Sequence, residues 1–297
     1  MSLKSNYIIL INYNNYVDTI ECLMSIKRQS YTNCVPIVVD NASANESVEL
    51  IKASHPDVYI IENKENVGFS GANNIGAQEA INQGAEIITF LNNDMVLADN
   101  FFEILLKDLQ DDQCLCPLML YYDNHDLINY SGGYFDYKKG AGTTPERGKK
   151  LNPKTLERRE VTLAHGGCCA MTIATYLKLG PWKTDYFLYR EDDEYSIRMI
   201  TKGISIIFEP KAVLYHKESV TTGREAGLEF RNYYLTRNKL YNIQEYKLGR
   251  LVEIRAELGA LVGYVRYLLF KDNRFKHCLE GVIDYKKGIV GKKELNC

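Results

Sequence analysis

Several features that mark large classes of protein are missing from this sequence. No stretch approaches the roughly 18 uncharged apolar residues that a membrane-spanning helix needs, and the best candidate, residues 258–265, is stopped by Arg266. A surplus of positive charge is missing as well, because 36 basic and 38 acidic residues give a net charge of −2, which disfavours a nucleic-acid partner. The composition, 45% hydrophobic and 25% charged over 297 residues, indicates a globular chain of one large domain or two modest ones.

Cysteine motifs of redox and zinc sites are also absent. The eight cysteines include Cys114-x-Cys116 and the adjacent pair Cys168-Cys169, which are too closely spaced for a CxxC motif and have no accompanying histidine pair. The first apolar run, residues 7–11, is too short and too poorly flanked for a secretory signal. We therefore expect buried, unpaired cysteines in a cytoplasmic protein.

Short apolar segments alternate with amphipathic ones in the first part of the chain. The apolar segments are rich in β-branched residues and almost continuously hydrophobic, which is typical of strands covered on both faces. This alternation predicts an α/β fold, Rossmann-like, with a mostly parallel central sheet flanked by helices. The predicted strands are residues 7–12, 35–40, 58–62 and 86–91, and the predicted helices include residues 17–27, 48–51 and 72–84.

The rest of the chain adds further elements. Residues 128–160 contain several glycines and a basic cluster, and they predict a hairpin followed by a loop. Strands are predicted at residues 161–172 and 204–208, with a helix over residues 191–202 between them. From about residue 228 onward the pattern is helical.

Polar segments follow each of the four N-terminal strands. A single such segment is ordinary, because Asn, Asp and Ser form turns and cap helices. Parallel strands, however, end at one edge of a sheet, where ligands bind. Four polar segments at that edge therefore indicate a site for a polar ligand. They are Asn12-Tyr13-Asn14, residues 40–45, residues 66–74 and Asn92-Asn93-Asp94.

Two enzyme classes are disfavoured by what these segments lack. The glycines between Asn66 and Gly76 do not form GxGxxG directly after the first strand, so a dinucleotide-dependent oxidoreductase is weakly supported. Residues 12–16 contain neither glycine nor a basic residue, although a sugar nucleotidyltransferase would hold its triphosphate with such a loop.

Five short motifs occur in order between about residues 7 and 240. They are Val38-Val39-Asp40-Asn41-Ala42-Ser43, NVGFSGANNIG from Asn66 to Gly76, Leu91-Asn92-Asn93-Asp94, Tyr189-Arg190-Glu191-Asp192-Asp193-Glu194 with Arg198, and Tyr233-Tyr234-Leu235-Thr236-Arg237-Asn238. Taken together, the motifs resemble those of the family-2 glycosyltransferases of the GT-A fold, in particular their rhamnosyltransferase-like branch.

The resemblance implies a role for each polar segment. Asp40 would hydrogen-bond the nucleotide base, and Asp94 would bind a divalent metal, Mg²⁺ or Mn²⁺. Asp192, with Glu191 beside it, would be the catalytic base. The nucleotide-binding set would be Asn12, Asp40, Asn66, Gly68, Phe69, Asn74 and Asn93, His216 would join Asp94 at the metal, and Trp182, Gly167 and His165 would face the acceptor.

Elementary chemistry agrees with these roles. A nucleoside-diphosphate leaving group develops negative charge, which Mg²⁺ or Mn²⁺ neutralises through one or two carboxylates and the phosphates. The acceptor hydroxyl needs a positioned carboxylate to take its proton as it attacks the anomeric carbon in a single, inverting displacement. Residues 191–194 are four adjacent carboxylates at a predicted helix start. One would suffice for a cap, and repulsion among four should raise at least one pKa.

Other segments bear on specificity. Asn92 stands at the first position of the DxD-like motif, so the site supplies one carboxylate and we expect weak metal binding without the sugar nucleotide. Trp182-Lys183-Thr184-Asp185 replaces the family's common Phe-Asp-Glu, which leaves donor and acceptor selectivity open. Residues 217–224 predict either a lid over the diphosphate or an ordinary surface loop.

The C-terminal stretch is more basic than the rest of the chain. Residues 247–293 hold 11 basic and 5 acidic residues, together with aromatic and aliphatic side chains at positions 264 and 267–270. A basic amphipathic helix can lie on an anionic membrane surface. The alternative is a helical cap whose aromatic residues face the core.

The sequence thus predicts a GT-A domain at residues 1–225 and a helical extension packed on it at residues 226–297. The predicted activity is metal-assisted, inverting transfer of a hexose from a dTDP- or UDP-sugar to a glycan or lipid-linked saccharide, as in surface-polysaccharide synthesis. A non-catalytic nucleotide- or glycan-binding module and a sugar nucleotidyltransferase remain as alternatives. We expect a cytoplasmic protein with peripheral contact to the inner membrane face through its basic helices, no nucleic-acid partner, and an oligomeric state left open.

Overall fold

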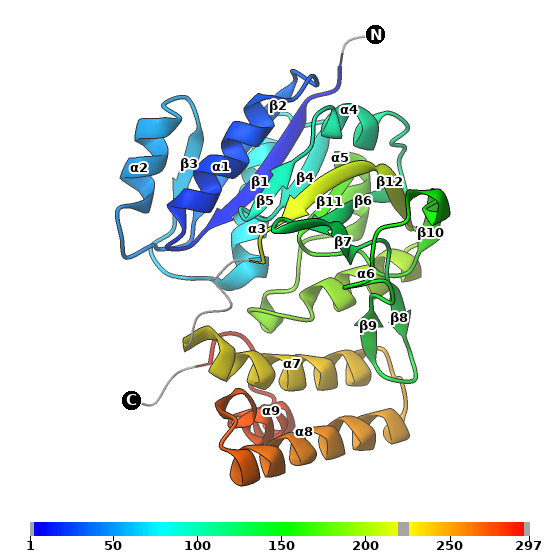
Figure 1. The fold of residues 1–297 in the computed structure, drawn as a ribbon. Coiled ribbons are helices and arrows are strands. Elements are labelled where there is room, and N and C mark those ends of the chain that lie inside the picture. Colours follow the sequence, from blue (N-terminus) through cyan, green and yellow to red (C-terminus); the bar gives the residue numbers. More distant parts are fainter. Residues whose placement is uncertain (1–2, 219–225, 294–297) are drawn as a thin grey trace.

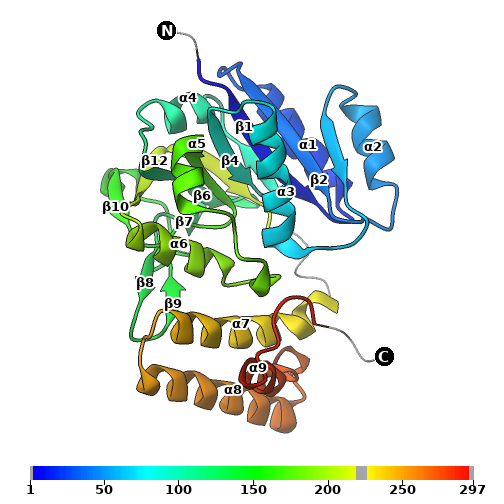
Figure 2. The same cartoon turned by 180° about the vertical axis from the view of Figure 1, so that it is seen from behind.

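The central sheet forms where the sequence is apolar and β-branched (Figures 1 and 2). The computed structural model describes residues 3–218 and 226–293. Its first four main strands agree with the predicted ones to within one residue at each end. They are β1 (Asn6–Asn12), β2 (Cys34–Asp40), β3 (Tyr59–Glu62) and β4 (Ile87–Leu91).

The strand order across the sheet is β10-β12-β6-β11-β4-β1-β2-β3. Six of these strands (β3, β2, β1, β4, β6 and β12) run in one direction, and β11 runs antiparallel between β4 and β6. The α/β prediction with a mostly parallel central sheet is therefore confirmed. The later strands are β5 (Met95–Leu97), β6 (Gln113–Tyr121), β7 (Asn124–Tyr130), β8 (Tyr134–Asp136), β9 (Ala141–Thr143), β10 (Arg159–Val161), β11 (Cys168–Thr172) and β12 (Ser205–His216).

Helices cover both faces of the sheet and leave its carboxyl edge to loops. Helices α1 (Tyr16–Lys27) and α4 (Phe101–Leu106) lie in front of the sheet in Figure 1, whereas α3 (Gly68–Asn82) and α5 (Ile173–Leu179) lie in front of it in Figure 2. Strands β1 and β4 are almost fully buried as a result. Helix α2 (Ser47–Ser54) packs on α1, and α6 (Glu191–Thr201) packs near β12. The described cysteines are free, and most are buried, as predicted.

Two predicted strands need correction. The strand expected over residues 161–172 is wrong in its middle, because residues 162–167 turn away between β10 and β11 and the Cys168 amide bonds the His165 carbonyl at 3.2 Å. The strand expected over residues 204–208 continues to His216 as β12, past an irregularity between Glu209 and Val213 that breaks the apolar pattern. The helix expected over residues 191–202 is confirmed as α6.

The C-terminal helices form a layer below the sheet in both views, with α8 outermost (Figures 1 and 2). They are α7 (Ala226–Glu245), α8 (Arg250–Phe270) and α9 (Cys278–Lys286), and they share a small apolar core of their own. The division into domains at residues 225 and 226 stays a prediction. In residues 3–218 and 226–293, no helix combines the length and apolarity that crossing a membrane would take.

Candidate functional site

Asn12 and Asp40 lie side by side at the carboxyl edge of the sheet, because β1 and β2 are parallel and place the two residues opposite each other. Both are buried, and Asn12 Nδ2 donates to Asp40 Oδ1 at 2.7 Å. Asp40 also accepts from the Ser43 amide at 2.9 Å and from Ser43 Oγ at 2.6 Å. Three hydrogen bonds therefore orient this carboxylate.

Thr19 extends the network to the end of β4. Its Oγ1 donates to Asn12 Oδ1 at 2.8 Å and accepts from Asn93 Nδ2 at 2.8 Å. Thr19 is fully buried on α1. Its hydroxyl links α1 to the ends of β1 and β4, and Asn12 continues the network to Asp40 at the end of β2. The structure thus brings together Asn12, Asp40 and Asn93. Nothing in the sequence singled out Thr19, which lies within an ordinary amphipathic helix.

The loop before α3 is held by bonds within the chain. Asn66 Oδ1 accepts from the Gly68 amide and from Asn41 Nδ2, each at 2.9 Å. Gly68 has a φ of +76°, and a Cβ there would lie 2.5 Å from the Phe187 carbonyl oxygen. The Phe69 amide donates to that same oxygen at 2.8 Å. Position 68 therefore requires glycine because the backbone of the turn before α6 lies so close to it.

Asn74 is bonded to the backbone of Trp182. Its Oδ1 accepts from the Trp182 amide and its Nδ2 donates to the Trp182 carbonyl, each at 2.8 Å. Trp182 is itself buried, stacks on Tyr195 with ring centroids 3.8 Å apart, and meets Phe69 edge-on at 5.6 Å. These contacts give Asn74 and Trp182 a positioning role. Nucleotide contact by Asn74 and acceptor contact by Trp182 stay predictions.

Asp94 and His216 meet because β5 pairs antiparallel with β12, which sets Met95 opposite His216. Asp94 Oδ2 lies 3.3 Å from His216 Nε2. On the other side of the ring, His216 Nδ1 lies 3.0 Å from Asn129 Oδ1, and Asn129 Nδ2 donates to Glu218 Oε1 at 2.6 Å. Since Asn129 turns its oxygen toward the imidazole, Nδ1 carries the proton. No feature of the sequence pointed to Asn129.

This pair suits a divalent cation. With Nδ1 turned to Asn129, His216 directs its Nε2 toward the Asp94 carboxylate, and an imidazole nitrogen and a carboxylate oxygen that face each other are ligands that a divalent cation accepts. Within the described ranges, no group of three or more His, Cys, Asp or Glu side chains is arranged to hold a metal. Asp94 and His216 could therefore hold Mg²⁺ or Mn²⁺ only together with oxygens of a bound ligand.

Two of the four carboxylates at the start of α6 are neutralised by arginine. Asp193 is buried and pairs with Arg190 at 2.9 Å. Glu194 is buried and accepts two hydrogen bonds from Arg198, at 2.9 and 3.0 Å. The bidentate Glu194–Arg198 pair fixes both the orientation and the charge of its carboxylate. The second half of the acidic run is therefore structural.

The first two carboxylates of the run have raised pKa values. Burial, aided by the charge of Asp192, raises the pKa of Glu191 to about 8. Burial, aided by the charge of Asp193, raises the pKa of Asp192 to about 6. The predicted rise is confirmed, although burial contributes more than repulsion. Among the described residues, Glu191 Oε2 has no hydrogen-bond partner.

A short segment between β10 and β11 connects the two acidic groups. The Gly167 carbonyl accepts from the Asn92 amide at 2.8 Å, two residues before Asp94. The adjacent Gly166 amide hydrogen-bonds Asp192. The candidate base and the candidate metal ligand are therefore held by neighbouring peptide groups. These contacts explain why residues 162–167 leave the sheet.

His165 lies in this segment as a neutral ring. Its Nδ1 accepts from the Gly167 amide at 2.9 Å. Burial and the neighbouring His216 and Arg147 charges lower the pKa of His165 to about 3. Because Nδ1 is an acceptor, the ring proton lies on Nε2, which leaves a neutral donor there. Acceptor contact by His165 and Gly167 stays a prediction.

Helix α6 starts from a turn in the left-handed region. Phe187, Tyr189 and Arg190 have φ values of +58°, +66° and +71°, which bulky residues adopt only when their surroundings impose it. Asn238 of α7 supplies that constraint, since its Nδ2 donates to three carbonyls of residues 186–189 at 2.7 to 2.9 Å. The turn delivers Glu191 and Asp192 to the site.

Arg237, next to Asn238, completes this clamp. It is fully buried, and its guanidinium donates to the carbonyls of Asp185 and Tyr186, each at 3.3 Å. It also donates to the Gly291 carbonyl at 2.9 Å. The motif that ends in Arg237-Asn238 was visible in the sequence, but its function as a backbone clamp was not, because the turn lies about 50 residues earlier.

The predicted lid over residues 217–224 lies largely outside the described residues, which stop at Glu218 and resume at residue 226. Lys217 is described, and its Nζ pairs with Asp18 at 2.6 Å and with Glu21 at 2.5 Å. Its amide also donates to the Asp94 carbonyl at 3.1 Å. Lys217 is thus held between Asp94 and the acidic residues of α1.

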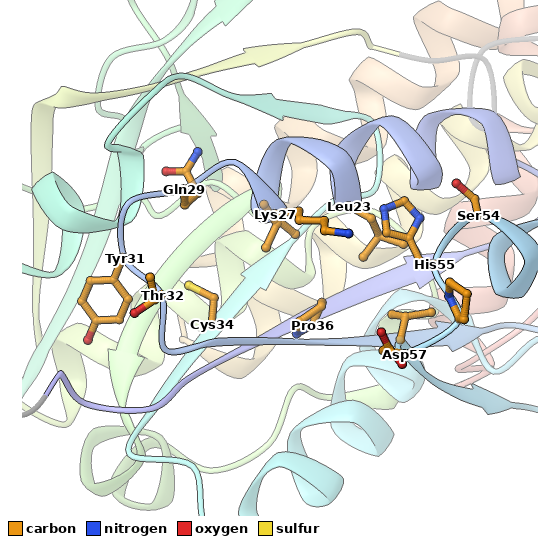
Figure 3. A pocket seen from close by; sticks show the side chains of 13 residues that line it. Leu23, Lys27, Gln29, Tyr31, Thr32, Cys34, Pro36, Ser54, His55 and Asp57 are labelled. Atoms are coloured by element: carbon orange, nitrogen blue, oxygen red, sulfur yellow. The ribbon is translucent and has the colours of Figure 1, made fainter.

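A cavity of about 360 Å³ lies elsewhere, at the amino-terminal ends of β2 and β3 (Figure 3). Its wall includes Tyr31, Cys34 and His55. It contains none of the residues predicted for the site, and it lies at the opposite end of β2 from Asp40. We therefore regard it as separate from the carboxyl-edge site.

The sheet order and the polar carboxyl edge agree with the GT-A fold that the sequence predicts. The sequence agrees, because residues 7–177 match Glycosyl transferase family 2. The chain belongs to this family.

Two curated relatives cover most of the chain. The dTDP-rhamnosyl transferase RfbF of Shigella flexneri is 21% identical over 97% of this chain and 97% of its own length. The low-salt glycan biosynthesis hexosyltransferase Agl10 of Haloferax volcanii is 26% identical over 69% of this chain and 68% of its own. The predicted resemblance is therefore confirmed, and the protein is a glycosyltransferase.

Two solved structures share the fold. GalNAc-T7 with UDP, GalNAc and Mn²⁺ has a TM-score of 0.61 and 18% identity. The match covers 97% of this chain and 58% of the GalNAc-T7 chain. The mannosyltransferase PcManGT from Pyrobaculum calidifontis, with GDP-Man and Mn²⁺, has a TM-score of 0.59 and 16% identity, covering 96% of this chain and 88% of that one. At these identities the likeness establishes the GT-A fold alone.

Proposed function

We propose that the protein transfers a hexose from a nucleotide-diphospho sugar, with dTDP or UDP as the nucleotide, to a glycan or lipid-linked saccharide, with inversion. Family membership and the full-length likeness to a dTDP-rhamnosyl transferase support this proposal. In it, residues 1–225 bind the donor and carry the chemistry, and residues 226–297 form the helical extension. A lipid-linked acceptor would bring the enzyme to the inner face of a membrane.

One observation carries the proposal: Asp192 is a half-buried carboxylate with a pKa raised to about 6. A general base is most effective when its pKa lies near the working pH, since it is then ionised and still basic enough to accept a proton. The amides of Asp193 and Gly166 hydrogen-bond this carboxylate and fix its direction. In our proposal Asp192 accepts the proton of the acceptor hydroxyl.

Glu191 would support Asp192 without sharing its task. Its pKa of about 8 keeps the carboxyl protonated at neutral pH, so a second negative charge beside Asp192 is avoided. If Glu191 were ionised, repulsion would raise the pKa of Asp192 further and leave less of the active base. We therefore assign it a positioning and charge-setting role.

The donor would lie along the carboxyl edge of the sheet. Asp40 would accept from the base, and Asn12 and Asn93 would keep the buried network ordered around it. Asp94 and His216 would hold Mg²⁺ or Mn²⁺ against the diphosphate. A bound cation would neutralise the negative charge that develops on the leaving group.

The replacement Asp192→Asn tests the proposal. We expect nucleotide binding to persist and transfer to fall by at least about a hundredfold, the usual contribution of a general base. Binding would be followed by thermal shift with dTDP and UDP, and turnover by release of nucleoside diphosphate. Asp108→Asn, at an exposed carboxylate after α4, is the matched control.

Turnover of Asp192→Asn at the rate of the native protein would refute the assignment. A different result is that the native protein binds nucleotide and transfers no sugar with any of a panel of donors and saccharides. That result would support a non-catalytic binding module. A thermal-shift screen of sugar nucleotides with Mn²⁺ would identify the donor.

A further inference from the structure

Helix α8 exposes a continuous apolar surface. Six of its residues, which we call the apolar stripe, are between 43% and 72% exposed. Monomeric globular proteins rarely expose a contiguous apolar patch of this kind without a partner. The apolar stripe consists of Leu251, Leu258, Leu261, Val262, Val265 and Leu269.

The spacing of these residues places them on one side of the helix. At about 100° per residue, the stripe falls within a sector of about 100°, and no charged residue interrupts it. The roughly opposite sector contains the buried residues Val252, Ala256, Ala260 and Gly263. These belong to or adjoin the core shared with α7 and α9, so the orientation of the stripe is fixed.

The position of α8 leaves the stripe accessible. Both views show α8 as the outermost element, on the side of α7 away from the sheet (Figures 1 and 2). The stripe lies roughly opposite the side of α8 that packs on its neighbours, and so faces away from the molecule. Phe270, at the end of the helix, extends the apolar surface and is 74% exposed.

Positive charge borders the stripe. Arg255 and Arg266 lie next to it on the helix and are exposed. Beyond the helix end, Lys271, Arg274 and Lys276 are exposed as well. Residues 250–276 contain six basic and three acidic residues.

Each of those three carboxylates already has a basic partner. Arg250 pairs with Glu253 at 2.7 Å, and Lys286 pairs with Glu257 at 3.0 Å. Asp272 is paired with Arg274 at 2.8 Å and with Arg266 at 3.6 Å. The acidic groups therefore do not offset the field of Arg255 and Lys271.

We propose that α8 docks in the plane of an anionic lipid bilayer, with the apolar stripe in the acyl boundary and the flanking basic residues at the headgroups. A helix with an apolar face and basic margins binds membranes in this way, through buried apolar area together with attraction to anionic lipids. The inference goes beyond the transfer reaction and does not depend on donor or acceptor. An antiparallel pairing with a second copy fits less well, because it would set Arg255 and Arg266 against the same residues of the other copy.

Flotation with lipid vesicles tests this inference on the full chain. Vesicles of phosphatidylcholine mixed with phosphatidylglycerol should bind the protein at low salt, and vesicles of phosphatidylcholine alone should bind it less. Raising the salt concentration should weaken the binding, because it screens the headgroup charge.

Substitutions separate the two contributions. Leu258→Glu places a charge in the stripe and should reduce vesicle binding by about tenfold or more. Leu177→Glu, at a 62% exposed leucine on α5, is the matched control and should bind like the native protein. The double substitution Arg255→Glu with Arg266→Glu should remove the preference for anionic vesicles. If Leu258→Glu lowers thermal stability, Val262→Glu, at a 68% exposed site, replaces it.

Three outcomes would overturn the inference. One is that the native protein does not float with either kind of vesicle. Another is that the stripe variants bind as tightly as the Leu177→Glu control. The third is that light scattering shows a dimer that Leu258→Glu dissociates, which would assign the stripe to a second copy. Nucleotide release by Leu258→Glu with a soluble acceptor should be unchanged, so failure here would leave the proposed transfer reaction untouched.

Discussion

At the scale of single residues, the acidic run at the start of α6 is divided by its partners. Arg190 and Arg198 pair with the last two carboxylates, whereas the first two have no arginine partner among the described ion pairs and have the pKa values that burial raises to about 8 and about 6. Burial raises the pKa of Asp193 as well, against the opposing charge of Arg190. The Glu194–Arg198 pair could be predicted, because residues four apart lie on one helix face. The environment of Asp192 could not, since Gly166 reaches it from another part of the chain.

The pH dependence of transfer should report Asp192. A base acts in its ionised form, so kcat should rise with pH through about 6 and level off above it. Initial rates of nucleoside diphosphate release across the pH range would measure this limb. A profile that stays flat through pH 6 would contradict the role of Asp192.

At the scale of elements, α7 sets the start of α6. The Asn238 amide holds three carbonyls of a turn whose residues adopt positive φ values. The sequence could not show that α7 holds the turn before α6, because local periodicity describes one helix at a time. The clamp makes the position of Asp192 depend on a helix that lies outside the region matching the family, residues 7–177.

Asn238→Ala should therefore impair catalysis more than binding. Without its donors the turn relaxes, and we expect kcat to fall by about tenfold or more while the affinity for nucleotide stays nearly unchanged. The melting temperature should fall by a few degrees, because buried carbonyls lose their partner. Steady-state kinetics and thermal unfolding measure the two effects.

Asn232→Ala is the control on the same helix, since its side chain bonds the Arg274 carbonyl at 2.6 Å and not the turn before α6. Equal losses of kcat in the two variants would show that α7 contributes only general stability. A loss confined to Asn238→Ala would support the positioning role.

At the scale of the whole molecule, stability should depend on the protonation of Glu191. The folded state holds this proton up to about pH 8, whereas an ordinary glutamate releases it near 4.5. The folded state thus binds the proton more tightly than the unfolded chain does. Its contribution to the free energy of unfolding is complete below about pH 4.5 and is lost as pH rises through 8.

Glu191→Gln carries a neutral amide in place of the protonated carboxyl, so this pH dependence should disappear. The melting temperature of the variant relative to the native protein should increase from about pH 5 to about pH 8.5. Glu160→Gln, at an exposed site on β10, should show no such trend. A constant difference between Glu191→Gln and the native protein would contradict the raised pKa.

The sequence predicted the fold where each strand is buried on both faces, as in β1 and β4. It failed at residues 162–167, because an apolar stretch with a glycine pair has the composition of a strand although its peptide groups bond Asn92 and Asp192 instead. Among candidate site residues, those at strand ends could be proposed from their position in the sequence, and the structure brings Asn12, Asp40 and Asn93 together. Thr19 and Asn129 were missed because their roles arise only from long-range contacts.

The pairing of β5 with β12 has a consequence for how the protein is made. Asp94 emerges early in synthesis, but His216 joins it only after β12 has inserted between β6 and β10. A nascent chain therefore presents Asp94 without its imidazole partner, and it cannot form the complete cation pair. If Asp94 and His216 bind the cation as proposed, binding of a metal–nucleotide complex would mark that residues 205–216 have docked.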